Sequence, residues 1–185
     1  MNYVTQNDLV SELQAGLIEQ PRTALVDYTE RQVNYGFAEK PNFEYCAEHG
    51  IPCVDIGRMG GAFVVNKGDI GLGHVAKGFD NTVGYEIYMK FTEYLKNKGL
   101  NAEANDNDIL IDGYKVFGWA SKHYQQQDAT FITCHFSMSV DIELINAICT
   151  KPMNKIPKGL SDFGVTREEV INFLENYINK QGGNR

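Results

Sequence analysis

Apolar residues recur at helical spacing in five stretches of the chain. Leu9, Leu13 and Leu17 are each four residues apart, which predicts a helix over residues 5–20 that Pro21 ends. The longest apolar face predicts a helix over residues 81–98, ended by Gly99. Shorter patterns predict helices over residues 42–49 and 141–148, and a last helix that follows a capping box at residues 166–169.

Short apolar runs bounded by glycine, proline and asparagine predict strands between these helices. They cover residues 23–28, 31–36, 53–56, 58–65 (a glycine turn that leads into a strand), 70–75, 100–104, 109–111, 114–117 and 129–140. We expect 23–28 and 31–36 to form a hairpin, and 109–111 and 114–117 to form another across Asp112-Gly113, a dipeptide typical of tight turns. Hairpins with segregated helices predict an α+β domain whose sheet is largely antiparallel or mixed and is flanked by helices.

Composition narrows the class of protein. A chain of 185 residues can bury a sizeable core, and we expect one domain over residues 1–185. The net charge of −7, with no cluster of lysine or arginine, argues against a nucleic-acid partner. No apolar run approaches the roughly 18 residues of a membrane span, so we expect no membrane partner. The first residues lack the basic and apolar regions of a signal peptide, which predicts a cytoplasmic protein.

Three stretches carry candidate chemistry. The paired glycines Gly60-Gly61 allow a backbone to close over a ligand, and Arg58 before them can pair with an anion. The side chains of Asn107-Asp108 can hold a phosphate or a metal ion, although the same pair also suits an ordinary turn. Lys115 follows the second predicted hairpin turn, and Gly118 leaves room beside it for a ligand. A solvated hairpin lysine would fit the same pattern.

Taken in order, these motifs resemble the catalytic domain of the superfamily of lipoate–protein ligases, biotin–protein ligases and octanoyltransferases, and most of all the lipoate–protein ligase A family. The resemblance runs from about residue 24 to residue 177. The motifs that carry it are Arg58-Met59-Gly60-Gly61-Ala62, Gly68-Asp69, Leu100-Asn101-Ala102-Glu103-Ala104, Asn107-Asp108-Ile109-Leu110, Lys115-Val116-Phe117-Gly118-Trp119-Ala120, Asp141-Ile142 and Gly159-Leu160-Ser161. It implies a class II synthetase-like biotin/lipoate ligase fold, here without the family's C-terminal accessory domain.

The resemblance implies an ATP-dependent acyl–protein ligase. Such an enzyme activates lipoate or octanoate (or, in related ligases, biotin) to an acyl-adenylate, and transfers the acyl group to a lysine of a lipoyl-domain or H-protein-type carrier. By the same resemblance, Lys115 is the catalytic residue, which would stabilise negative charge on the acyl carbonyl and the phosphate. The implied binding residues are Arg58, Gly60, Gly61, Ala62, Asp69, His74, Asn107, Asp108 and Gly118, and Asn107 and Asp108 would hold the phosphate directly or through Mg²⁺.

Two other functions stay open. Octanoyltransferases of the superfamily use no ATP and take the acyl group onto a cysteine thiolate assisted by a lysine. Cys149 follows Lys115 in the chain and is the candidate for that role; a thiol beside an ammonium group would have a lowered pKa. Cys149 also suits a buried thiol at a helix end. The third function is a non-catalytic acyl- or protein-binding module on the same scaffold.

The chain departs from the ligase pattern at the glycine turn, which is poorer in glycine and arginine and has Met59 in place of a small residue, and at three further places. Asp69 stands where the ligases have an asparagine, and Val65-Asn66 stand where a histidine is expected after the glycine turn. Cys134-His135 occupy the place of a His-Gly pair. These departures bear on adenylate formation more than on acyl binding.

Overall fold

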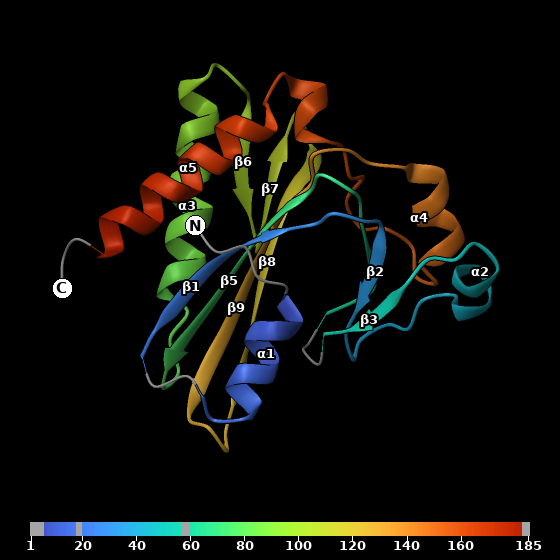
Figure 1. The fold of residues 1–185 in the computed structure, drawn as a ribbon. Coiled ribbons are helices and arrows are strands. Elements are labelled where there is room, and N and C mark those ends of the chain that lie inside the picture. Colours follow the sequence, from blue (N-terminus) through green and yellow to red (C-terminus); the bar gives the residue numbers. More distant parts are fainter. Residues whose placement is uncertain (1–5, 18–19, 57–59, 183–185) are drawn as a thin grey trace.

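The computed structural model describes residues 6–17, 20–56 and 60–182 as an α+β domain (Figure 1). Its helices are α1 (Gln6–Gln14), α2 (Phe43–Glu48), α3 (Thr82–Asn97), α4 (Ile142–Ile148), α5 (Arg167–Gly182) and a 3-10 turn, η1 (Leu160–Phe163). Its strands are β1 (Arg22–Asp27), β2 (Gln32–Tyr35), β3 (Cys53–Asp55), β4 (Phe63–Val65), β5 (Ile70–Lys77), β6 (Ala102–Asn105), β7 (Asp108–Ile111), β8 (Tyr114–Tyr124) and β9 (Ala129–Phe136). The predicted fold class is therefore confirmed.

The strands form two sheets. Six strands lie in the order β1-β5-β9-β8-β7-β6, and every neighbouring pair is antiparallel. The other three lie in the order β3-β2-β4, with β3 parallel and β4 antiparallel to β2. The turn between β7 and β8 is the predicted one, and Asp112 and Gly113 both have positive φ, at 50° and 82°.

Two predictions about the first third of the chain were wrong. The strands at 23–28 and 31–36 do not pair: β1 joins β5 in the large sheet, and β2 joins the small one. The first helix ends at Gln14 rather than at residue 20, because the chain turns at Gly16, whose φ is +69°. Leu17 continued the spacing of Leu9 and Leu13, but its exposed fraction is 71%.

One face of the large sheet packs against α3 and α5 and holds the main core (Figure 1). On α3, Ile87, Phe91 and Leu95 recur every four residues and are fully buried, because this spacing places them on one side of the helix. They meet the side chains of Leu72 on β5 and Phe136 on β9 in the same cluster.

The opposite face is covered in two parts. At one end, Leu9 and Leu13 of α1 pack on Val75 and Phe131. At the other end lies the small sheet, whose strands pack against α2 and α4 through a separate cluster that includes Val33. Figure 1 shows α2 and α4 beside the small sheet, away from α3 and α5. Among the described residues, no helix combines the length and the apolar character that crossing a membrane requires.

Candidate functional site

An irregularity in the strand pairing turns Lys115 onto the face opposite α3. Ile109 pairs with Phe117, but the next residue, Leu110, pairs with Lys115, so β8 contributes one extra residue between the two pairs. Simple alternation from Phe117, which lies in the α3 core, would send the Lys115 side chain into that core. The extra residue reverses this, and such bulges often aim a side chain at a functional site.

The Lys115 ammonium group is held by a carboxylate that a second lysine shares. The distance from Lys115 Nζ to Asp108 Oδ1 is 2.8 Å, and that from Lys155 Nζ to Asp108 Oδ2 is 3.0 Å. The Asp108 side chain is 17% exposed, whereas that of Lys115 is 40% exposed. Burial alone would lower the pKa of Lys155, but its hydrogen bonds and charge interactions with Asp108 and Asp106 outweigh this and raise it. Two cations thus flank one half-buried anion.

Gly118 provides the room for this pairing. A Cβ atom at Gly118 would lie 3.0 Å from Asp108 Oδ1 and 3.4 Å from Lys115 Nζ, closer than most side chains tolerate. The backbone of Lys115 is fixed by the segment after α4, because Lys115 N donates to Ile156 O and Lys158 N donates to Lys115 O. The same segment carries Lys155, which explains how it reaches the site.

The glycine turn lies on the same side of the sheet as Lys115. Phe63, which follows the turn on β4, packs against the His135 ring with their centroids 5.4 Å apart. His135 on β9 pairs with Gly118 on β8, so the two share a sheet face. The predicted lysine and the predicted glycine turn are therefore both near His135. Arg58 and Met59 lie outside the described residues.

Glu39 fixes the glycine turn, and the sequence analysis missed it. Its Oε2 atom accepts a hydrogen bond from Ala62 N, and a Cβ atom on Gly61 would lie 2.7 Å from the same oxygen. Its Oε1 atom accepts from Thr150 N and Lys151 N, after α4. Gly60 has a φ of +135°, which favours glycine. No motif surrounds Glu39, so only the folded chain reveals that it ties the turn to a distant loop.

Asp69 is a fully buried carboxylate beside this region. It accepts hydrogen bonds from Asn66 N and Met138 N at 2.9 Å and 2.7 Å, and His135 Nε2 lies 3.0 Å from its Oδ2 atom. Asn107 lies in the turn before β7 with an exposed side chain. In the part of the chain that the structure describes, no group of three or more histidine, cysteine, aspartate or glutamate residues could hold a metal ion.

Two predicted site residues differ from expectation: His74 in its position, and Cys149 in the pKa of its thiol. His74 pairs with Ile132, so its side chain faces the α3 core and not Lys115, and its Nδ1 atom lies 2.6 Å from Thr23 Oγ1. The Cys149 thiol donates to Ala62 O. Burial, followed by the charge of Glu39 and by Cys46, raises the pKa of the Cys149 thiol to about 11. The predicted lowering of that pKa by Lys115 is therefore wrong, and the reading as a buried helix-end thiol fits better.

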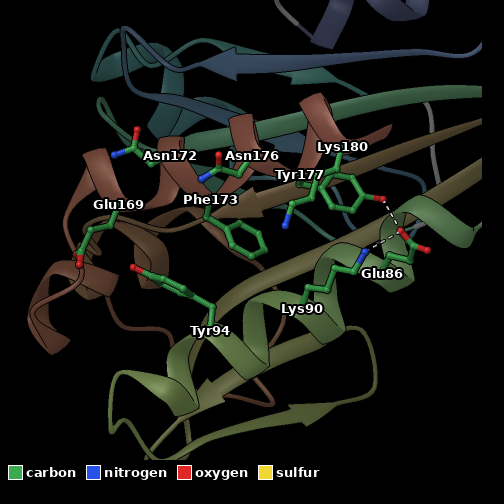
Figure 2. Close-up of a pocket in the computed structure, with 9 residues that line it drawn as sticks. All are labelled: Glu86, Lys90, Tyr94, Glu169, Asn172, Phe173, Asn176, Tyr177 and Lys180. Atoms are coloured by element: carbon green, nitrogen blue, oxygen red, sulfur yellow. Dashed lines mark hydrogen bonds and ion pairs between the residues drawn. The ribbon is translucent and has the colours of Figure 1, made fainter. Parts of the chain in front are cut away.

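A groove elsewhere on the protein is separate from this site. It has a volume of about 650 Å³ and lies between α3 and α5, with Tyr94 and Phe173 among the residues that line it (Figure 2). In Figure 2, dashed lines join Glu86 to Lys90 on the same helix and to Tyr177 across the groove. Because α3 and α5 cover the core face of the sheet, this groove opens away from Lys115.

Comparison with solved structures places the fold. The LipL1 protein of P. falciparum, in complex with lipoate, matches with a TM-score of 0.71 at 17% identity, over 100% of this chain and 61% of that one. A bipartite lipoate protein ligase of Thermoplasma acidophilum matches with a TM-score of 0.67 at 18% identity, over 93% and 77% of the two chains. A lipoate–protein ligase A bound with ATP gives 0.65 at 22% identity, over 84% and 70%. At these identities the likeness shows the fold.

Comparison of the sequence gave two results. No curated protein matches it. A family model does match, under the description "Lipoyl protein ligase A/B catalytic domain", over residues 17–180. That range covers most of the chain, including the bulged strand with Lys115, the glycine turn and Asp69. The chain belongs to the lipoyl protein ligase A/B catalytic domain family.

Proposed function

We propose that the chain is an acyl–protein ligase that activates lipoate or octanoate with ATP and transfers the acyl group to a lysine of a carrier. The carrier would be of the lipoyl-domain or H-protein type. The observation that carries the proposal is the pair of ammonium groups, Lys115 and Lys155, held on either side of Asp108 beside Gly118. Membership of the family, the likeness to LipL1 in complex with lipoate and the likeness to a lipoate–protein ligase A bound with ATP support it.

Lys115 would act by stabilising negative charge on the acyl carbonyl oxygen and on the adenylate phosphate. Asp108 holds the Lys115 ammonium group in place. This limits the entropy that the lysine side chain would lose when substrate binds. A phosphate carries more charge than one carboxylate and would compete with Asp108 for both lysines. Charge that develops on the carbonyl oxygen in the transition state would then meet a preorganised cation.

The residues present suit a phosphate better than Mg²⁺. Asp108 was one of two expected metal ligands, but two ammonium groups already neutralise it. The other, Asn107, is exposed in a turn. A cation at Asp108 would face two like charges at short range, which is unfavourable. We therefore assign the phosphate to Lys115 and Lys155, and give Asn107 and Asp108 no part in holding Mg²⁺.

The test is a Lys115→Met variant, which removes the ammonium group and keeps a side chain of similar length. We expect pyrophosphate release with ATP and lipoate or octanoate to fall by about 100- to 1000-fold. Lys122→Met is the matched control, since Lys122 lies further along β8 and pairs with Phe131 rather than with a site residue. We expect little change in that variant.

The same assay separates the three candidate functions. An unchanged rate in Lys115→Met would contradict the role of Lys115. If the unmodified protein releases no pyrophosphate with either acid, the ligase proposal is wrong. Acyl gain from an octanoyl carrier without ATP would then indicate a transferase, and no acyl gain from any donor would indicate a binding module.

A further inference from the structure

Three side chains form a hydrogen-bonded row on the Lys115 side of the sheet. His135 Nε2 lies 3.0 Å from Asp69 Oδ2, and the other ring nitrogen, Nδ1, lies 3.5 Å from Ser137 Oγ. The exposed fractions of the Asp69 and His135 side chains are 1% and 14%, and Ser137 is half-buried. A carboxylate, an imidazole and a hydroxyl in this order are the parts of an activated oxygen nucleophile.

Asp69 fixes which ring nitrogen of His135 carries the proton. A carboxylate accepts hydrogen bonds, so Nε2 carries the hydrogen that it donates to Asp69. This leaves Nδ1 with a lone pair that faces the Ser137 hydroxyl, which can donate to it. The distance of 3.5 Å is long, but hydrogen bonds between nucleophile and base often tighten when a substrate binds.

The surroundings hold both partners of this row rigidly. Backbone amides of Asn66 and Met138 donate to the Asp69 carboxylate. The His135 ring is packed against Tyr28, edge to face at 5.9 Å between centroids, and against Phe63. The backbone donors hold Asp69, and the aromatic rings packed against His135 keep the imidazole in one orientation. General-base catalysis needs such a fixed orientation.

Ser137 is also a neighbour of the Lys115 strand. Ser137 N donates to Val116 O, the residue next to Lys115. The side chains of Ser137 and Lys115 both face away from α3, since Ser137 contacts His135 and Lys115 lies beside Gly118. A hydroxyl that attacks a carbonyl here would have an ammonium group at hand for the negative charge on the carbonyl oxygen.

We propose that Ser137 is an acyl-accepting nucleophile, with His135 as its base and Asp69 as the residue that positions His135. The substrate class is an activated fatty-type acyl group, either an acyl-adenylate or an acyl thioester. The choice of acyl chain rests on the proposed function, whereas the chemistry of the row does not. This role falls to Ser137 rather than to Cys149, whose thiol faces a carbonyl oxygen.

The reaction would run in two steps, the acylation of Ser137 and the transfer of the acyl group to the acceptor amine. The Ser137 oxygen bonds to the carbonyl carbon, its proton passes to His135 Nδ1, and the bond to the leaving group breaks with its electron pair. A thiolate recovers that proton from His135, whereas a phosphate leaves as its anion and the proton passes to water. The acceptor amine then attacks the ester carbon. His135 takes a proton from the amine and gives one to the departing Ser137 oxygen, which restores the hydroxyl.

The test uses p-nitrophenyl octanoate with the full chain, without ATP. We expect a burst of p-nitrophenolate and an octanoyl group that peptide mass spectrometry locates on Ser137. Ser137→Ala should abolish the burst, and His135→Gln should slow it by about 100-fold or more. Ser139→Ala is the matched control, because Ser139 is two residues further on with an exposed side chain. It should keep the burst.

Several results would overturn the inference. These are no burst in the unmodified protein, an equal burst in Ser137→Ala, or an octanoyl group on Cys149 or Lys115 instead. Ser137→Cys is a second variant, which should form a thioester that hydroxylamine cleaves at neutral pH. Pyrophosphate release by Ser137→Ala separates this inference from the ligase proposal. If that variant still releases pyrophosphate and shows no loss of acyl transfer, the row is structural and the ligase proposal stands.

Discussion

The two faces of the six-stranded sheet are built from different kinds of residue, although the same strands supply both. On β5, Ile70 and Leu72 face α3, whereas Gly71 and Gly73, which alternate with them, lie at positions that face the other way. On β9 the pattern is similar, with Phe136 in the α3 core and His135 on the opposite side. Around Lys115 and His135, one face therefore carries large apolar side chains and the other carries glycine and polar groups, whereas the part of the second face under α1 is apolar.

This difference separates stability from chemistry. Large side chains that interlock with α3 and α5 contribute most of the apolar burial, and their loss should unfold the domain. Small residues on the opposite face leave room for long side chains such as Lys115 to lie along the sheet. The functional site therefore forms on the face opposite α3. We expect substitutions on the α3 face to change the free energy of unfolding, and substitutions around Lys115 to change activity.

The largest expected effect is on the core face, at Phe91. Its ring is fully buried and contacts Phe136 and Phe173, with centroids 4.9 Å and 5.0 Å apart. Phe91→Ala should lower the free energy of unfolding by about 3–5 kcal/mol, through lost burial and a cavity. Chemical denaturation measures it. A cost below 1 kcal/mol would contradict the division between the two faces.

The next effect is on the opposite face, at Glu39. Glu39→Ala would leave the amides of Ala62, Thr150 and Lys151 without their carboxylate and release the glycine turn. We expect a loss of about 1–2 kcal/mol in unfolding free energy, and a rise in the KM for the acid that exceeds the fall in kcat. An unchanged KM would mean that the glycine turn does not help to bind the acid.

A smaller effect on activity is expected at Gly118. In Gly118→Ala, the added methyl group would crowd Asp108 Oδ1 and Lys115 Nζ and shift the ammonium group by a few tenths of an ångström. We expect about a tenfold loss of pyrophosphate release, with an unfolding free energy that changes much less than in Phe91→Ala. Equal activity in the variant would show that the ammonium position is not critical.

The sequence predicted the elements of the fold better than their partners. The periodicity of α3 and the Asp112-Gly113 turn are local features, so residues nearby in the chain determine them. The pairing of β1 with β5 was missed, because a two-residue spacer at Thr29-Glu30 looks like a hairpin turn while the real partner lies some forty residues later. Strand pairing depends on which apolar faces share a core, and a single sequence does not show this.

The candidate site was predicted in part for the same reason. Lys115, Gly118 and Asp108 are close in sequence, and a hairpin brings them together. Lys155 and Glu39 reach the site from loops without a recognisable motif, so only the fold reveals them. Asp69 and His135 were noted separately as departures from the ligase pattern. Their hydrogen bond depends on β5 and β9 being neighbours.

The smallest expected effect is a pH dependence of the free energy of unfolding. It comes from Glu169, at the start of α5 on the core face of the sheet. Glu169 closes the predicted capping box through Thr166 N, and it also accepts a hydrogen bond from Lys98 (Figure 2 shows Glu169 at the edge of the groove). The hydrogen bond from Lys98, followed by that from Thr166 N, lowers the pKa of Glu169 from 4.5 to about 2. Because the folded state lowers this pKa, the charged carboxylate favours folding above the unfolded pKa of about 4.5.

Glu169→Gln keeps an acceptor for the capping box and removes the charge. The unmodified protein should be more stable than this variant at pH 6, and the difference should shrink as the pH falls from about 4.5 towards 2. It should be small, because the ion pair is partly exposed and salt screens it. Pyrophosphate release should not change, since Glu169 lies on the core side of the sheet. A pH-independent difference in stability would assign the role of Glu169 to the cap alone, whereas a loss of activity would mean that the two faces are coupled.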